Sequence, residues 1–139
     1  MNKSEKLKEK IKENFSFKAT SQQKEVINDV SDFVCSLGNK YIFLLKGYAG
    51  TGKTSLISSL VKSLSSVYKR TSLLAPTGRA AKVLSGYSNK TAHTIHKKIY
   101  WIKKNSKGNT YVTLQENLNT NCIFIVDEAS MIPAHTDKS

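Results

Sequence analysis

The chain has 139 residues, the length of one small domain. With 39% hydrophobic residues and only two prolines, its composition excludes a disordered chain. The formal net charge of +12 suits a polyanionic partner, of which nucleic acid is the common case, although a lysine-rich soluble surface would have the same balance.

The sequence has no sign of export or of membrane insertion. Its first residues carry positive charge, but no apolar segment of a signal peptide follows them, and no apolar run approaches the roughly 18 residues of a membrane span. Cys35 and Cys122 share no metal or redox spacing and lie in apolar runs, which predicts two small buried hydrophobic residues. We therefore expect a cytoplasmic protein without a membrane partner, and nothing in the sequence indicates an oligomeric state.

Two helical segments are expected before the first strand. Residues 1–14 alternate lysine and glutamate with few apolar positions, which predicts a solvated helix or a frayed tail that adds charge but little core. From Ser21 to Leu37 the apolar residues recur at the helical period of 3.6, with Thr20 as the N-cap and Gly38-Asn39 as the stop. This second segment is the first helix predicted to pack on a core.

Strands and helices alternate over the rest of the chain. The runs Tyr41–Leu45 and Cys122–Val126 are continuous and apolar, and both are expected to be buried parallel strands. A polar stretch around Lys107-Gly108-Asn109 predicts a small hairpin. The other expected elements are a helix over Ser55–Leu64, a strand over Thr71–Ala75, and helices over Arg79–Leu84 and Thr94–Trp101.

This order of elements predicts the α/β class, with a parallel sheet flanked by helices on both faces. Ligands of such sheets bind at the carboxyl ends of the strands. Gly47 and Asp127 both begin at a predicted strand end. The two motifs that start there are therefore expected at one edge of the sheet.

The segment Gly47–Thr54, with the sequence G-Y-A-G-T-G-K-T, is a complete phosphate-binding loop and indicates a P-loop NTPase. Its glycines let backbone N–H groups turn toward phosphates, and the following helix points the positive end of its dipole at the same place. Lys53 is expected to reach the β- and γ-phosphates, and Thr54 to bind Mg²⁺. The residues expected to bind the nucleotide here are Gly47, Tyr48, Ala49, Gly50, Thr51, Gly52, Lys53, Thr54 and Ser55.

A second motif ends the strand Cys122–Val126. A hydrophobic strand followed by Asp127 and Glu128 is the Walker B arrangement, in which the aspartate holds Mg²⁺ and the glutamate orients and polarises the attacking water. The alternative is a strand whose exposed end happens to carry two acids. Because a phosphate loop and one intervening strand precede the motif, we expect Lys53, Asp127 and Glu128 to form the catalytic set.

Gln23 has two interpretations. Its amide offers one donor group and one acceptor, which matches the donor–acceptor edge of adenine. Thr20 and Gln23 also form a T-x-x-Q capping box, which needs no ligand. The residues alone favour the capping box.

Residues 75–82 (A-P-T-G-R-A-A-K) and 91–96 (T-A-H-T-I-H) combine hydroxyls, backbone N–H groups and a cation at a helix start, which suits nucleic-acid phosphates. A basic and aromatic mixture suited to single strands follows at Lys97, Lys98, Tyr100 and Trp101. A capped helix with a solvated basic face explains the same residues equally well. His93 and His96 are too isolated to indicate a metal site.

Together, the segments Thr20–Lys24, G-Y-A-G-T-G-K-T, A-P-T-G-R-A-A, T-I-H and V-D-E-A-S-M resemble the first motor domain of superfamily 1 DNA helicases of the RecD, Dda and Pif type. The likeness covers about Phe17 to Pro133. It implies a RecA-like fold, ATP and Mg²⁺ as cofactors, and ATP-driven translocation on single-stranded DNA with 5′-to-3′ unwinding. It also favours adenine recognition by Gln23. The DNA contacts that it implies are Pro76, Thr77, Gly78, Arg79, Thr94 and His96.

The resembled family continues after V-D-E-A-S-M with a glutamine-containing motif and a second RecA-like domain, whose arginines close on the γ-phosphate. Because this sequence stops at Ser139, it is expected to be an N-terminal fragment, with residues 1–16 as a charged tail or helix and 17–139 as a partial RecA-like ATP-binding domain. Such a fragment is expected to bind Mg·ATP weakly and not to unwind DNA. The alternatives are another P-loop ATPase or kinase without a nucleic-acid role, and a non-catalytic nucleic-acid-binding remnant.

Overall fold

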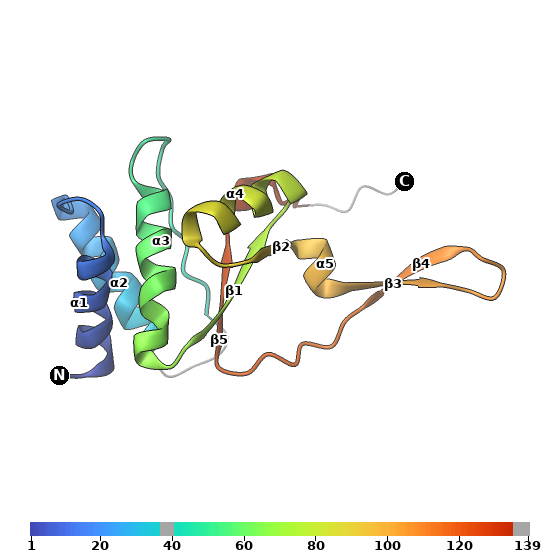
Figure 1. The fold of residues 1–139 in the computed structure, drawn as a ribbon, viewed down its shortest axis with the longest axis horizontal. Helices are drawn as coiled ribbons and strands as arrows, with labels where there is room; N and C mark the ends of the chain where they lie inside the picture. The colour runs from blue at the N-terminus through green and yellow to red at the C-terminus, as the bar shows by residue number, and fades with distance from the viewer. Residues whose placement is uncertain (37–40, 135–139) are drawn as a thin grey trace. The chain divides into compact units, whose positions relative to one another are not determined.

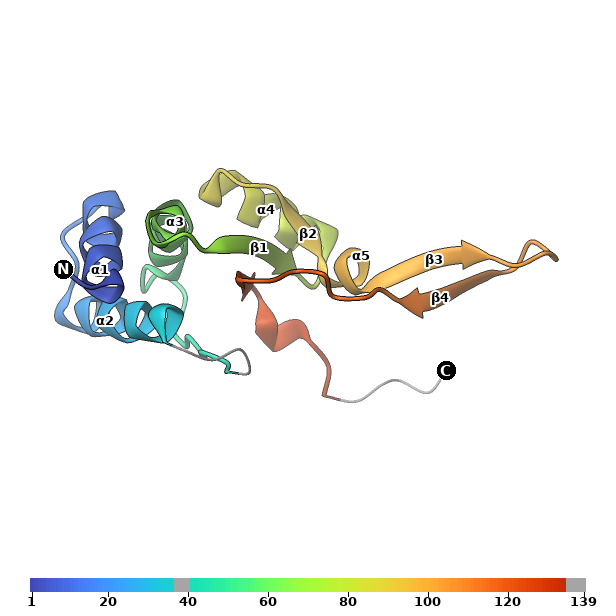
Figure 2. The ribbon, with the colours of Figure 1, turned by 90° about the horizontal axis from the view of Figure 1, so that it is seen from below.

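The computed structural model describes residues 1–36 and 41–134, and the chain forms two compact units, Met1–Thr71 and Ser72–Ser139. The elements of each unit are drawn in Figure 1 and Figure 2. The predicted end of the first helix, at Leu37, Gly38 and Asn39, lies outside the described residues. Within those residues, no helix has both the length and the apolar character needed to cross a membrane.

Helices make up most of the first unit. They are α1 (Lys3–Asn14), α2 (Ser21–Cys35), α3 (Lys53–Ser63) and the short 3₁₀ helix η1 (Leu64–Val67). α1 packs against the other three. The predictions of a helix from Ser21 with Thr20 as its N-cap, and of a helix after the phosphate loop, are confirmed.

The expectation that the N-terminal segment adds little core is wrong. Leu7 and Ile11, one turn apart on α1, have no exposed surface. The end of α1 is tied to α3, where the Asn14 side chain donates to the Ser63 hydroxyl at 3.0 Å and Ser59 donates to the Asn14 carbonyl at 3.1 Å. Two apolar residues at positions i and i+4 form a narrow stripe, which neighbouring helices bury completely. Because the other faces of α1 carry lysines and glutamates, the overall composition of the segment does not reveal this stripe.

The predicted strand Tyr41–Leu45 is also wrong, because residues 41–48, all of them described, form no strand. The exposure of the side chains still alternates along this segment, since Phe43 and Leu45 are half-buried while Ile42 and Leu44 are 92% and 66% exposed. Phe43 lies against Phe33 of α2, with ring centroids 5.5 Å apart. A parallel strand forms only where neighbours accept and donate its backbone hydrogen bonds, a condition that an apolar run does not create by itself.

The second unit contains a sheet with the strand order β2-β1-β5, formed by β1 (Arg70–Ala75), β2 (Ala92–Thr94) and β5 (Cys122–Val126). β1 and β2 are parallel, and α4 (Gly78–Ser88) connects them and packs on β2 (Figure 1). Strands near Thr71–Ala75 and at Cys122–Val126 are therefore confirmed, as is the α/β class with a parallel sheet flanked by helices. The helix predicted over Arg79–Leu84 extends one turn further.

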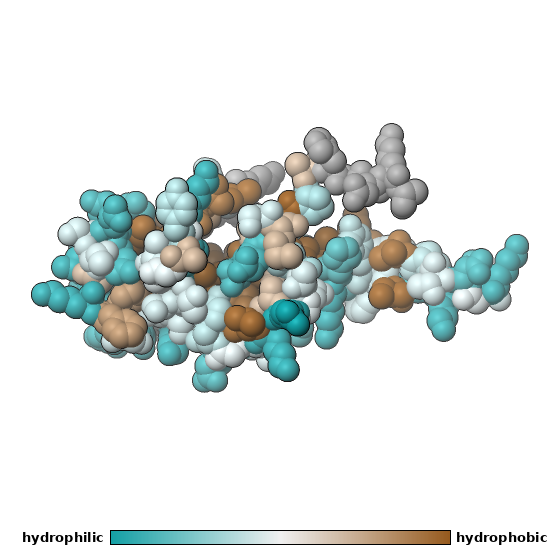
Figure 3. Space-filling model, turned by 90° about the horizontal axis from the view of Figure 1, so that it is seen from above, coloured by the Kyte–Doolittle hydropathy of each residue, from teal (hydrophilic) through white to brown (hydrophobic). Residues whose placement is uncertain are grey.

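A single helix over Thr94–Trp101 is not formed. α5 covers only Ile95–Ile99, and Tyr100 begins β3 (Tyr100–Lys104), which pairs with β4 (Thr110–Leu114) in the predicted hairpin. β-branched and aromatic residues face one another across these strands, as at Ile102 and Val112, which favours a strand over a helix. The hairpin extends from α5 in Figure 2, and Figure 3 shows hydrophobic side chains near its base and hydrophilic ones at its tip.

Candidate nucleotide-binding site

The phosphate loop leads directly into the N-terminus of α3. Gly50 and Gly52 have φ angles of +78° and +87°, in the left-handed region that side chains rarely adopt. Gly52 is the N-cap of the helix, and Lys53 is its first residue. The first N–H groups of a helix have no partner within it, so this end of α3 can bind an anion.

The side chains of Lys53 and Thr51 donate hydrogen bonds to backbone carbonyls within the phosphate loop. The Lys53 ammonium donates to the carbonyl oxygens of Gly47 and of Tyr48, the latter at 2.8 Å. The Thr51 hydroxyl donates to the same Tyr48 carbonyl at 2.7 Å. A Cβ on Gly47 would lie 2.8 Å from the Thr51 hydroxyl oxygen, so a larger residue there would displace the Thr51 side chain. To reach a phosphate, Lys53 would exchange two carbonyl partners for phosphate oxygens.

Gln23 forms the capping box and also contacts the phosphate loop. The side-chain oxygen of Gln23 accepts a hydrogen bond from the backbone N–H of Thr20 at 2.9 Å. The backbone N–H of Gln23 donates to the Thr20 hydroxyl at 3.2 Å. Its side-chain nitrogen donates to the Thr51 carbonyl at 3.1 Å. The capping interpretation is therefore confirmed. An amide has two donor hydrogens and two acceptor lone pairs, so capacity for adenine remains, and that role stays a prediction.

A cavity of about 690 Å³ lies beside the loop. It is lined by the loop itself, by the first turn of α2 and by Phe15 and Phe17, of which Phe17 is 73% exposed. Its volume falls in the range of small-molecule pockets. Neither phenylalanine was predicted as a site residue, although two aromatic residues shortly before Thr20 could have indicated a surface for the flat ring of a nucleotide base.

In the second unit, the segments predicted to contact DNA and the acidic pair Asp127-Glu128 lie at the carboxyl edge of the sheet. Ala75, the last residue of β1, lies opposite Thr94, the last residue of β2. The segments Pro76–Arg79 and Thr94–His96 therefore leave the sheet side by side. Thr77 and Thr94 are the N-caps of α4 and α5, and each hydroxyl accepts a backbone N–H at 3.1 Å. The DNA contacts expected of these residues stay predictions.

The acidic pair continues β5 at the same edge. The Asp127 N–H donates to the Leu74 carbonyl of β1 at 3.0 Å. The Asp127 carboxylate accepts the Glu128 N–H at 2.9 Å through one oxygen and the Tyr87 hydroxyl at 2.7 Å through the other. Glu128 itself is exposed and has a φ of +52°, which turns the chain out of the strand.

Tyr87 was not predicted from the sequence. It lies on α4, 40 residues before Asp127, and no local pattern connects the two. Burial, followed by the hydrogen bond and the charge of Asp127, raises the pKa of Tyr87 well above its ordinary value of 10.0. The hydroxyl therefore stays protonated at neutral pH and donates a hydrogen bond to the carboxylate.

The residues predicted to hold Mg²⁺ have suitable chemistry. The Thr54 hydroxyl and the Asp127 carboxylate are hard oxygen donors, and Mg²⁺ in nucleotide sites takes few protein ligands besides phosphate and water. Within the described residues, no group of three or more His, Cys, Asp or Glu side chains could hold a metal on its own. Thr54 and Asp127 belong to different units, and their shared site stays a prediction.

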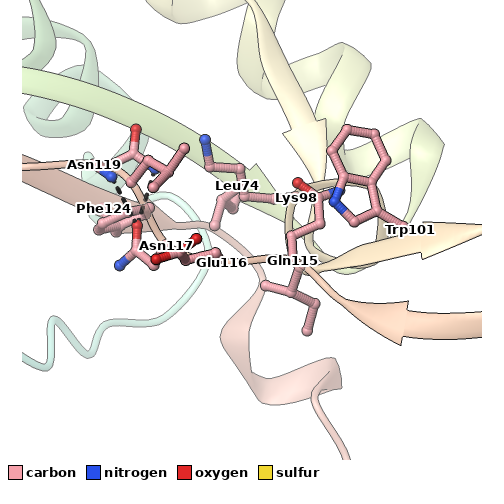
Figure 4. A pocket seen from close by; sticks show the side chains of 10 residues that line it. Leu74, Lys98, Trp101, Gln115, Glu116, Asn117, Asn119 and Phe124 are labelled. Carbon is pink, nitrogen blue, oxygen red and sulfur yellow. Dashed lines mark hydrogen bonds between the residues drawn. The ribbon is translucent and has the colours of Figure 1, made fainter.

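A further cavity, of about 680 Å³, lies within the second unit between α5, the sheet and the segment after β4 (Figure 4). Leu74 and Phe124 of the sheet line it, and Lys98 and Trp101 border it. The Gln115 amide donates to the carbonyls of Lys97 and Tyr100, at 3.0 and 2.8 Å, and so ties this segment to the start of the hairpin. Of the basic and aromatic residues after Thr94, Lys98 and Trp101 thus border a cavity, and the group is divided between α5 and β3 and does not form one helix face.

Comparison with known proteins extends this description. Residues 32–138 match the family model described as an AAA domain. Over 117 residues the chain is 31% identical to an uncharacterised protein of Methanocaldococcus jannaschii, a match that covers 76% of this chain and 10% of that protein. The chain therefore spans about a tenth of the length of this relative.

Proposed function

The chain belongs to the AAA domain family of P-loop NTPases, with a RecA-like α/β fold, and on this basis we propose that it is the ATP-binding part of a DNA helicase motor. In such a motor, hydrolysis of Mg·ATP drives translocation along single-stranded DNA. Domains of this family are found in helicase-like proteins, which supports the proposal.

The phosphate loop is the observation that carries the ATP-binding part of this proposal. Gly50 and Gly52 turn the chain into the N-terminus of α3, and Lys53 stands at the first position of that helix. Backbone N–H groups and one ammonium group would there meet the phosphates of the nucleotide. The adjoining cavity has room for the nucleoside, with Gln23 available for the adenine edge and Phe17 for the ring face.

Hydrolysis would need the acidic pair as well. Thr54 and Asp127 would hold Mg²⁺, which supplies positive charge to the phosphate oxygens while they transfer. Glu128 would accept a hydrogen bond from the attacking water and orient it toward the γ-phosphate. Its exposed position just after the half-buried Asp127 leaves its carboxylate accessible to water.

The carboxyl edge of the sheet in the second unit supports single-stranded DNA as the proposed partner. Two helix N-termini lie side by side there, with exposed Arg79 and His96 in their first turns. Phosphate oxygens accept hydrogen bonds from such groups, and the net charge of +12 adds long-range attraction. The proposed contacts remain Pro76, Thr77, Gly78, Arg79, Thr94 and His96.

Titration of the chain with ATP in the presence of Mg²⁺, followed by calorimetry, tests the nucleotide part. Lys53→Ala is expected to abolish measurable binding, whereas Lys62→Ala, an exposed lysine near the end of the same helix, is expected to leave it unchanged. Equal affinities for the unchanged chain and Lys53→Ala would refute nucleotide binding by the loop and favour a non-catalytic nucleic-acid-binding protein.

A salt titration of binding to oligothymidylate tests the DNA part. Arg79→Ala is expected to weaken binding and to reduce the salt dependence by about one phosphate contact, while Lys90→Ala, an exposed cation beyond the other end of α4, is expected to change neither. If the chain binds ATP but shows no DNA binding at low salt, it is a P-loop ATPase or kinase without a nucleic-acid role.

A further inference from the structure

Two hydrogen bonds hold the side chain of Asp127. One carboxylate oxygen accepts the backbone N–H of Glu128 at 2.9 Å, and the other accepts the hydroxyl of Tyr87 at 2.7 Å. Both Asp127 and Tyr87 are half-buried. Two hydrogen bonds to different oxygens restrict the rotation of the carboxylate about its last side-chain bond, which is otherwise broad.

α4 brings Tyr87 to this position. The buried face of the helix contains Ala81, Leu84 and Ser88, and Tyr87 follows Leu84 by three residues, so it lies on the adjoining part of that face. A phenylalanine at position 87 would fill the same space beside the helix. The hydroxyl therefore adds a hydrogen bond to Asp127, which packing does not require.

We propose that Tyr87 is a positioning residue, which holds the Asp127 carboxylate in an orientation suited to bind Mg²⁺. The inference rests on the nucleotide-binding function proposed above. A carboxylate has about four lone-pair positions, and the two hydrogen bonds leave the others for a metal ion or its water. Groups that hydrogen-bond to a metal ligand in this way orient it, and their loss weakens metal binding although they never touch the metal.

The test is the affinity for ATP, measured by calorimetry once with Mg²⁺ and once with EDTA. Tyr87→Phe removes only the hydroxyl, and Tyr111→Phe removes a hydroxyl from the exposed hairpin as the matched control. Tyr87→Phe is expected to lower the Mg²⁺-dependent affinity about 10-fold and the affinity in EDTA by less than about 2-fold. Tyr111→Phe is expected to change neither.

Asp127→Asn provides a second, independent measurement. The asparagine can still accept the Tyr87 hydroxyl but lacks the charge that attracts Mg²⁺, so the gain in affinity from Mg²⁺ is expected to disappear. Adding Tyr87→Phe to Asp127→Asn is then expected to cause no further loss, because the hydroxyl acts through the carboxylate. An additional loss in the double variant would overturn the proposal.

The outcomes separate this inference from the proposed function. If the unchanged chain binds no ATP with Mg²⁺ or with EDTA, the nucleotide-binding proposal is wrong, and the role of Tyr87 is wrong with it. If the unchanged chain binds ATP but gains no affinity from Mg²⁺, nucleotide binding stands and the positioning role of Tyr87 is overturned. If the unchanged chain does gain affinity but Tyr87→Phe behaves like Tyr111→Phe, only the positioning role is overturned. Equal losses in Mg²⁺ and in EDTA would show that Tyr87 serves the fold alone, and these too would overturn it.

Discussion

The side-chain nitrogen of Gln23 donates a hydrogen bond to the carbonyl oxygen of Thr51, over 3.1 Å. One amide thus connects the start of α2 to the middle of the phosphate loop, while its oxygen caps α2 through the Thr20 N–H. A Cβ on Gly52 would lie only 2.6 Å from the same nitrogen. The loop conformation and the helix cap are therefore stabilised together, and a change in either is expected to reach the other.

Gln23→Glu separates the two bonds of this amide. A glutamate still accepts the Thr20 N–H in a capping box, but it has no hydrogen to donate to the Thr51 carbonyl. We expect the capping bond to be retained and ATP affinity to fall about 2- to 12-fold, the equivalent of one hydrogen bond of about 0.5–1.5 kcal/mol. Gln22→Glu adds the same charge one residue earlier. Equal losses in the two variants would contradict a specific role for Gln23.

Gly52→Ala tests the left-handed conformation of the loop. The substitution places a Cβ on a residue with φ +87° and directs it against the Gln23 amide, so we expect a cost of about 1–3 kcal/mol in unfolding free energy and a loss of ATP binding. Gly86→Ala is the control, because a Cβ there meets nothing within 4 Å and the residue lies within α4. That change is expected to stabilise the chain by about 0.5–1 kcal/mol. A neutral Gly52→Ala in urea denaturation would refute the strained loop.

Ile11→Ala tests the contribution of α1 to the core. Ile11 has no exposed surface, and removing a buried side chain of this size costs about 2–5 kcal/mol. Lys12→Ala changes the next residue, whose ammonium forms only an exposed ion pair with Glu9, and it is expected to cost less than about 0.5 kcal/mol. Urea denaturation measures both. Similar small costs would mean that residues 1–14 are a solvated tail after all.

Asp32 is expected to make stability depend on pH at the acid end. Hydrogen bonds from Ser4 and then Lys8 lower the pKa of Asp32 below its ordinary value of 3.8. A lowered pKa stabilises the folded chain fully above pH 3.8, and this stabilisation is lost as the pH falls through the lower, folded-state value. The side chain is 61% exposed and the pair is therefore weak, so we expect Asp32→Asn to cost about 0.2–1 kcal/mol at pH 7.

The cost of Asp32→Asn is expected to vanish below the folded-state pKa, where the aspartic acid is neutral as well. Asp29→Asn removes the same charge from the same helix and serves as the control. The measurement is the unfolding free energy of the three chains between pH 2 and pH 7. A difference between Asp32→Asn and the unchanged chain that stays constant over this range would contradict the linkage.

Local features of this protein were predictable from the sequence because neighbouring residues suffice to form them. A glycine pattern before a helix produces the phosphate loop, and Thr20 and Gln23 cap α2 from three residues apart. Each depends on backbone conformation and short-range hydrogen bonds. The family resemblance depended on the same local motifs.

Tertiary structure decided the features that need a partner far along the chain. Leu7 and Ile11 become core only because other helices cover α1, and Tyr41–Leu45 forms no strand although its composition favours one. The hydroxyl of Tyr87 reaches Asp127 because α4 follows β1 and packs beside the sheet in which β5 pairs with β1. The sequence by itself determined which chemical groups this protein has, and the packing of distant segments decided which of them hold one another in place.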